Sequence, residues 1–145
     1  MCPLLLSNLG YVKRNRCIRE NTGDQNAFTL KYSHSDSLIS HAKAAIAHAE
    51  RLLREGAQIL DIGGESSRPG AVAVDADTEW ARIQAVVQAA VGWQVPVSVD
   101  TCKPAVMRLA LDAGADIIND IWALRQTGAA EVVAAHGQCG VCLMH

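Results

Sequence analysis

The sequence predicts an α/β fold with parallel strands, forming part of an eight-stranded (β/α)8 TIM barrel. Three observations favour this fold class. Short apolar runs alternate with helical patterns, a glycine follows each helical pattern, and polar residues stand where the apolar runs end. Strands that alternate with helices pair in parallel through right-handed crossovers, and such barrels carry their sites at the carboxyl ends of the strands. An open doubly wound sheet is the alternative, but no G-x-G-x-x-G follows any apolar run.

The helical and extended patterns can be placed in order along the chain. Apolar residues at three- and four-residue steps predict a first helix that begins at Ser37 and stops at Gly56. Asp77 is the expected cap of the second helix, and Thr101 is the expected cap of a third that starts near Pro104. The remaining elements follow from the same patterns: strands over 58–63, 95–100, 116–121 and 141–145, and helices over 78–91 and 128–135.

Two regions of different composition divide the 145 residues. Residues 1–36 mix polar and basic residues without a regular period, and we expect a poorly ordered segment that is atypical of the domain. Residues 37–145 are rich in alanine and regular, and form the predicted barrel domain. A complete barrel needs about 250 residues, so this domain corresponds to about four βα units.

Composition excludes several classes of protein. Half of the residues are hydrophobic, 19% are charged and the formal net charge is −2, which argues against a disordered chain and against nucleic-acid binding through positive charge. No apolar run approaches the roughly 18 residues of a membrane span. Five cysteines at irregular spacing do not resemble a secreted disulfide framework, so we expect a cytoplasmic protein.

Polar side chains at the predicted strand ends form the candidate site. An aspartate at such a position, Asp100, can accept hydrogen bonds from the N–H and amino groups of a heterocycle, and Asn119 can donate and accept beside it. Arg68, next to Pro69 in a glycine-rich loop, suits an anionic or planar aromatic ligand. A single aspartate of this kind more often caps a helix or turn, but such residues follow three successive strands here.

Four segments carry a resemblance to a known family. ILDIGGESSRPGA, VPVSVDTCKP, GADIINDI and VCLMH resemble, in order and spacing, the first half of dihydropteroate synthase over about residues 41–145. The resemblance implies a TIM-barrel transferase of folate biosynthesis that joins 4-aminobenzoate to 7,8-dihydropterin pyrophosphate and releases pyrophosphate. It also implies a homodimer as a possible assembly.

The resemblance assigns roles to particular residues. It implies that Asp100 and Asn119 bind the pterin, and that Ser67 and Arg68 bind substrate in the loop after the first strand. Asp61 and Glu65 match acidic positions of the same motif, for which we expect structural roles. No residue is assigned as a catalytic nucleophile, because positioning and electrostatic stabilisation would carry the reaction.

The sequence also departs from the family pattern. The family's first strand ends in a segment whose asparagine binds Mg²⁺, and residues 1–36 contain nothing like it. Mg²⁺ is therefore a family expectation without its usual ligand. The family's later motifs lie beyond residue 145, so we expect a truncated chain that is inactive alone. Two alternatives stay open: a non-catalytic truncated or frame-shifted fragment, and the pterin-binding domain of a methyltetrahydrofolate-dependent methyltransferase.

Three cysteines have their own alternatives. Cys102, near a helix start, is expected to be a small tolerated side chain, with a reactive thiol of lowered pKa as the alternative. Cys139 and Cys142 have a metal-like spacing that His136 and His145 extend. Residues three apart on a strand point to opposite faces, so we do not expect a metal site there.

Overall fold

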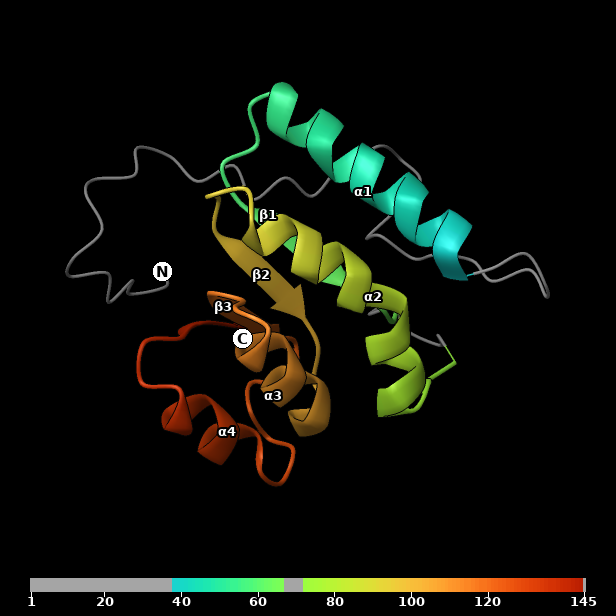
Figure 1. The fold of residues 1–145 in the computed structure, drawn as a ribbon. Coiled ribbons are helices and arrows are strands. Elements are labelled where there is room, and N and C mark those ends of the chain that lie inside the picture. The colour runs from blue at the N-terminus through green and yellow to red at the C-terminus, as the bar shows by residue number, and fades with distance from the viewer. Residues whose placement is uncertain (1–37, 67–71, 145) are drawn as a thin grey trace.

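The computed structural model describes residues 38–66 and 72–144, which alternate between helix and strand (Figure 1). The predicted strands pair in parallel and lie in the order β1-β2-β3-β4. This arrangement confirms the predicted fold class. The elements in chain order are α1 Leu38–Arg54, β1 Leu60–Gly63, α2 Ala76–Val91, β2 Val97–Asp100, α3 Pro104–Asp112, β3 Ile117–Asp120, α4 Ala129–Ala135 and β4 Gly140–Leu143.

Three parts of the sequence-based predictions lie outside the described residues. They are the proposed N-terminal segment 1–36, the two loop residues Ser67 and Arg68, and His145. Among the described residues, no helix is both long and apolar enough to cross a membrane.

The core lies between the sheet and the helices. Each helix contacts the next along the chain, from α1 to α4, and α2 contacts β1 and β2. Alternate strand residues face this layer, because successive side chains of a strand point to opposite faces. The buried apolar strand residues on the helix side are Leu60, Ile62, Val97, Val99 and Ile118.

Apolar residues at three- and four-residue steps on α2 and α3 are expected to face the core, and most of them do. Four residues expected on the inner face of α3 are all buried: Val106, Met107, Ala110 and Leu111. The spacing on α2 predicts four inward residues: Ile83 and Val87 are buried, Trp80 is partly buried against the core, and Val91, in the last turn, is 36% exposed.

Two predicted helix caps were wrong. Helix α2 begins two residues early and Asp75 caps it, with its Oδ1 accepting the Thr78 N–H at 2.7 Å. The hydrogen bonds to Thr78 also lower the pKa of Asp75. Helix α3 does begin at Pro104, but its cap residue is Lys103, and Thr101 Oγ1 only accepts the Lys103 N–H at 3.2 Å.

Glycines after two of the helices reverse the chain in the left-handed region. Gly56 follows α1 with φ +97° and Gly114 follows α3 with φ +102°, where a residue without Cβ avoids a steric penalty. The chain then enters β1 and β3.

Candidate functional site

A row of side chains crosses the carboxyl end of the sheet on the face opposite the helix-facing core residues. The strand register aligns Gly63 with Asp100, Asp100 with Asn119, and Asn119 with Cys142. All four positions therefore lie side by side on neighbouring strands. Gly63 keeps space open beside the carboxylate, because an added Cβ there would lie 3.4 Å from Asp100 Cβ and 3.8 Å from its Oδ2.

Asp61 also belongs to this site, although it lies further from the carboxyl end of its strand than the other residues. It lies two residues before Gly63 on the same face of β1, and its Oδ2 accepts a hydrogen bond from Asn119 Nδ2 at 3.2 Å. A carboxylate can only accept hydrogen bonds, so it selects the amino end of the Asn119 side chain. The amide oxygen of Asn119 is thereby turned away from Asp61 and left to accept from another donor.

Asp120 does not belong to the site, although it is adjacent to Asn119 in the sequence. It is fully buried on the helix side of β3. Its two carboxylate oxygens accept the N–H groups of Trp122 at 2.8 Å and Leu124 at 2.7 Å. These bonds hold the turn after β3, so Asp120 has a structural role.

Glu65, for which the sequence predicts a structural role, contacts two other segments of the chain. Its Oε2 accepts hydrogen bonds from Lys103 Nζ and from the Val74 N–H, the latter at 3.1 Å. Lys103 Nζ also binds Glu79 Oε2 at 2.5 Å. Burial opposes the charge on Lys103, but the hydrogen bonds to the two glutamates outweigh it and raise the pKa of the amine.

Lys103 and Glu79 were missed by the sequence-based reasoning. Lys103 stands in the VPVSVDTCKP segment that carries the family resemblance, and this was the signal that could have identified it. Glu79 occupies a helix position that reads as solvent-facing, yet only 1% of it is exposed. Its pairing with Lys103 depends on how α2 lies against the loop after β2, which no local pattern shows.

Two of the described cysteines, Cys102 and Cys139, have a pKa above the ordinary thiol value. Burial raises the pKa of the Cys102 thiol, and Gln126 Nε2 lies 3.6 Å from its Sγ. The alternative of a reactive, lowered-pKa thiol was therefore wrong. Burial also raises the pKa of Cys139, whose thiol donates to the carbonyl oxygen of Gly140 at 3.0 Å.

The described residues do not fit a metal ion. Within residues 38–66 and 72–144, no three His, Cys, Asp or Glu side chains gather closely enough to hold one. The Mg²⁺ that the family resemblance implies has no ligand set among these residues.

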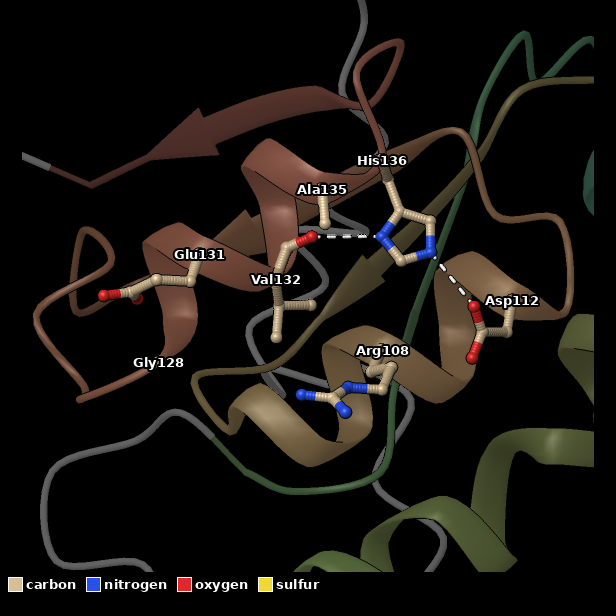
Figure 2. A pocket seen from close by; sticks show the side chains of 7 residues that line it. All are labelled: Arg108, Asp112, Gly128, Glu131, Val132, Ala135 and His136. Atoms are coloured by element: carbon tan, nitrogen blue, oxygen red, sulfur yellow. Dashed lines mark hydrogen bonds and ion pairs between the residues drawn. The ribbon is translucent and has the colours of Figure 1, made fainter.

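A groove of about 420 Å³ lies between α3 and α4 (Figure 2). His136 binds Asp112 Oδ1 through Nε2 and the Val132 carbonyl oxygen through Nδ1, both at 3.0 Å. All residues that line this groove belong to the two helices or their ends, whereas the strand-end row lies on the other face of the sheet. The groove is thus separate from the candidate site.

Together, the strand-end residues form a surface for hydrogen-bond donors. Asp100 and the oriented amide oxygen of Asn119 place two acceptors side by side on neighbouring parallel strands. Such a pair suits the donor-rich edge of a nitrogen heterocycle. The fold and this site define an α/β-barrel protein of the class that binds small molecules at the carboxyl ends of its strands.

Comparison with known proteins identifies the family. The family model described as pterin binding enzyme matches residues 31–145, and the chain belongs to this family. A dihydropteroate synthase of Neisseria meningitidis serogroup C is 52% identical over 96 residues, which cover 66% of this chain and 34% of that protein. The Bacillus subtilis (strain 168) enzyme is 44% identical over 116 residues, covering 79% of this chain and 38% of that protein.

Solved structures show the same similarity. The Burkholderia cenocepacia dihydropteroate synthase complexed with 7,8-dihydropteroate is 55% identical, with a TM-score of 0.69 over 72% of this chain and 37% of that chain. The Xanthomonas albilineans enzyme with 4-aminobenzoic acid is 52% identical, with a TM-score of 0.69 over 72% of this chain and 38% of that one. The chain therefore spans about a third of the length of the relatives that it matches.

Proposed function

We propose that this chain provides the pterin-binding part of a dihydropteroate synthase, a transferase that joins 4-aminobenzoate to 7,8-dihydropterin pyrophosphate. The observation that carries the proposal is the pair of acceptors at the strand ends, Asp100 beside an Asn119 amide that Asp61 orients. Identity of 44–55% to synthases from several bacteria supports it. The ligands named for the Burkholderia and Xanthomonas structures are a product and a substrate of that reaction.

In this proposal the protein contributes binding and orientation. Asp100 accepts from the amino and ring N–H groups of the pterin, and the Asn119 oxygen accepts from a neighbouring ring N–H. A carboxylate there also stabilises positive charge that develops on the pterin as pyrophosphate leaves. Arg68, outside the described residues, is proposed for the anionic parts of the substrates, and Ser67 for a hydrogen bond beside it. The arylamine of 4-aminobenzoate then attacks the exocyclic carbon that carried the pyrophosphate.

Isothermal titration of the 145-residue chain with 7,8-dihydropterin pyrophosphate tests the binding step. Asp100→Asn should weaken binding roughly tenfold or more, because a hydrogen bond to a charged group contributes about 1.5–3 kcal/mol. Glu131→Gln, an exposed change on α4, is the matched control and should leave the affinity unchanged. Tighter binding of methyltetrahydrofolate than of the pyrophosphate would favour the methyltransferase alternative. Equal affinities of the native chain and Asp100→Asn would overturn the role of Asp100.

A segment exchange tests the catalytic step. Residues 38–144 would replace the matching segment of the Burkholderia cenocepacia synthase, and dihydropteroate formation would be measured. We expect the exchanged protein to turn over and its Asp100→Asn variant to lose most of that activity. Because the chain spans about a third of these synthases, we expect the 145 residues alone to form little or no dihydropteroate.

The proposed setting is the cytoplasm, with a homodimer as the assembly to test by sedimentation.

A further inference from the structure

Lys103 lies where three segments that are distant in the sequence meet. Its Nζ donates to Oε2 of Glu65, which follows β1, and to Oε2 of Glu79, which lies in α2, at 2.5 Å in the second case. Lys103 itself is three residues beyond Asp100, between β2 and α3. One ammonium group therefore links the loop after β1, the first turns of α2 and the strand end that carries a predicted pterin ligand.

The two glutamates depend on this ammonium to different degrees. The side chain of Glu79 is 1% exposed and that of Glu65 is 22% exposed, while that of Lys103 is 17% exposed. Among the described residues, Glu79 Oε1 is buried without a hydrogen-bond partner. The Glu79 carboxylate could reach solvent only if α2 moved, because its side chain is buried. The Glu65 carboxylate can turn to solvent without such a movement, because its side chain is partly exposed.

Glu65 also connects the two ends of a loop. The same Oε2 that binds Lys103 accepts the Val74 N–H at 3.1 Å, nine residues further along the chain. The start of this stretch is held a second time, because Arg82 Nη1 donates to the carbonyl oxygen of Gly64 at 2.9 Å. The stretch between these ends contains the two loop residues for which substrate contacts are proposed.

We propose that Lys103 is a positioning residue that fixes the Glu65 carboxylate, and thereby holds the base of the loop at Glu65 and Val74 beside the strand end of Asp100. The inference rests on the proposed function for its effect on substrate, because Glu65 and Val74 flank the residues proposed there for the anionic part of the substrate. The position of the loop base itself can be measured without any ligand.

Hydrogen exchange of the Val74 amide, followed by NMR, tests the position of the loop base. In Lys103→Met the two carboxylates lose their shared cation and repel each other, and the more exposed Glu65 turns away. Val74 should then exchange at least about fivefold faster, because its acceptor is lost. Lys43→Met, an exposed lysine on α1, is the matched control and should leave the rate unchanged.

Glu79→Gln separates positioning from general stability. This variant lowers the free energy of unfolding but leaves Lys103 paired with Glu65, so Val74 should exchange as in the native chain. A merely structural role would instead raise the Val74 rate in step with the loss of stability in both variants. That result, or an unchanged Val74 rate in Lys103→Met, would overturn the proposal.

Glu65→Ala tests the effect on substrate binding. It also provides a second test of the proposal if Lys103→Met does not fold. The change removes a negative charge, so simple electrostatics predicts tighter binding of 7,8-dihydropterin pyrophosphate, whereas a misplaced loop predicts weaker binding. We expect at least about a fivefold loss for the pyrophosphate and no change for 6-hydroxymethyl-7,8-dihydropterin, which lacks the diphosphate. Tighter or unchanged pyrophosphate binding would overturn the role in substrate binding. If the native chain binds neither pterin, the proposed function fails, and the Val74 exchange rates alone decide the role of Lys103 at the loop base.

Discussion

At the scale of single residues, Asp61 shows how a side chain can act through its neighbour. It binds Asn119 Nδ2 at 3.2 Å and so determines which end of the amide is free to face a ligand. Asp61→Ala should weaken binding of 7,8-dihydropterin pyrophosphate roughly fivefold. This factor corresponds to about 1 kcal/mol, the typical net contribution of one hydrogen bond. Titration calorimetry measures the change.

The isosteric variant provides the control for this prediction. Asp61→Asn still offers an amide oxygen to Asn119, but it no longer forbids the flipped orientation. Its affinity should therefore lie between those of the native chain and Asp61→Ala. An affinity for Asp61→Ala equal to that of the native chain would show that Asn119 needs no partner to be oriented.

His136 gives a prediction about pH. Its bonds to the Val132 carbonyl oxygen and to the Asp112 carboxylate raise the pKa of the imidazole, against a smaller opposing effect of burial and of Arg108 (Figure 2). Protonated His136 therefore stabilises the folded chain. This contribution is fully present below the ordinary imidazole pKa of about 6.5 and is lost as the pH rises through the raised value.

Urea unfolding of the native chain and of His136→Gln, repeated between mildly acidic and mildly alkaline pH, measures this contribution. The difference in the free energy of unfolding between the two proteins should be largest at acidic pH and should shrink as the pH rises. Asp112→Asn should reduce the pH dependence of the native chain. A difference that grows with pH would mean that His136 is neutral when it makes these contacts.

At the scale of elements, the turn after β1 illustrates close packing of a loop on a helix. A Cβ at Gly64 would lie 2.7 Å from the Glu79 carbonyl oxygen and 2.9 Å from Glu79 Cγ. Gly64→Ala should therefore push the loop away from α2 and destabilise the chain by about 1–3 kcal/mol, as overpacking typically does. Gly137→Ala meets nothing within 4 Å and should change stability by less than about 0.5 kcal/mol. Thermal or urea unfolding of both variants makes the comparison.

The element patterns predicted the order and type of the helices and strands, but placed their ends less well. The first two strands begin two residues later than predicted, at Leu60 and Val97. Val95 packs against the core before its strand begins, and an apolar pattern cannot distinguish such a residue from a strand residue. The cap of α2 was misplaced because Asp75 and Asp77 are both aspartates, two residues apart, and either could cap the helix. The structure makes Asp75 the cap, since its backbone is extended and its side chain accepts the Thr78 N–H.

At the scale of the whole molecule, the strand-end residues could be predicted because parallel strands bring their carboxyl ends to one edge. Asp100 and Asn119 are register partners on adjacent strands, as that rule requires. Two other relations could not be predicted. The Asp61–Asn119 bond spans 58 residues and the Lys103–Glu65 pair spans 38; both depend on strand register and helix placement, which form only when the chain folds.

The described sheet ends in a strand that is covered poorly on its helix side. Val141 and Leu143 pair with the buried Ile118 and Asp120, yet they are 41% and 42% exposed, and Met144 is 53% exposed. Among the described strands, β4 pairs only with β3. Apolar side chains beside unpaired backbone groups favour association with another strand.

We therefore expect the 145-residue chain to self-associate in solution through β4. Sedimentation velocity should show an average mass that rises with protein concentration, and Leu143→Lys should lower it, because a charge at a sheet edge opposes pairing. Val72→Lys is the control: Val72 is 88% exposed in the loop before α2, away from β4, and its replacement should leave association unchanged. If both variants associate like the native chain, the contact lies elsewhere, and the exposed side of β4 does not determine how this chain assembles.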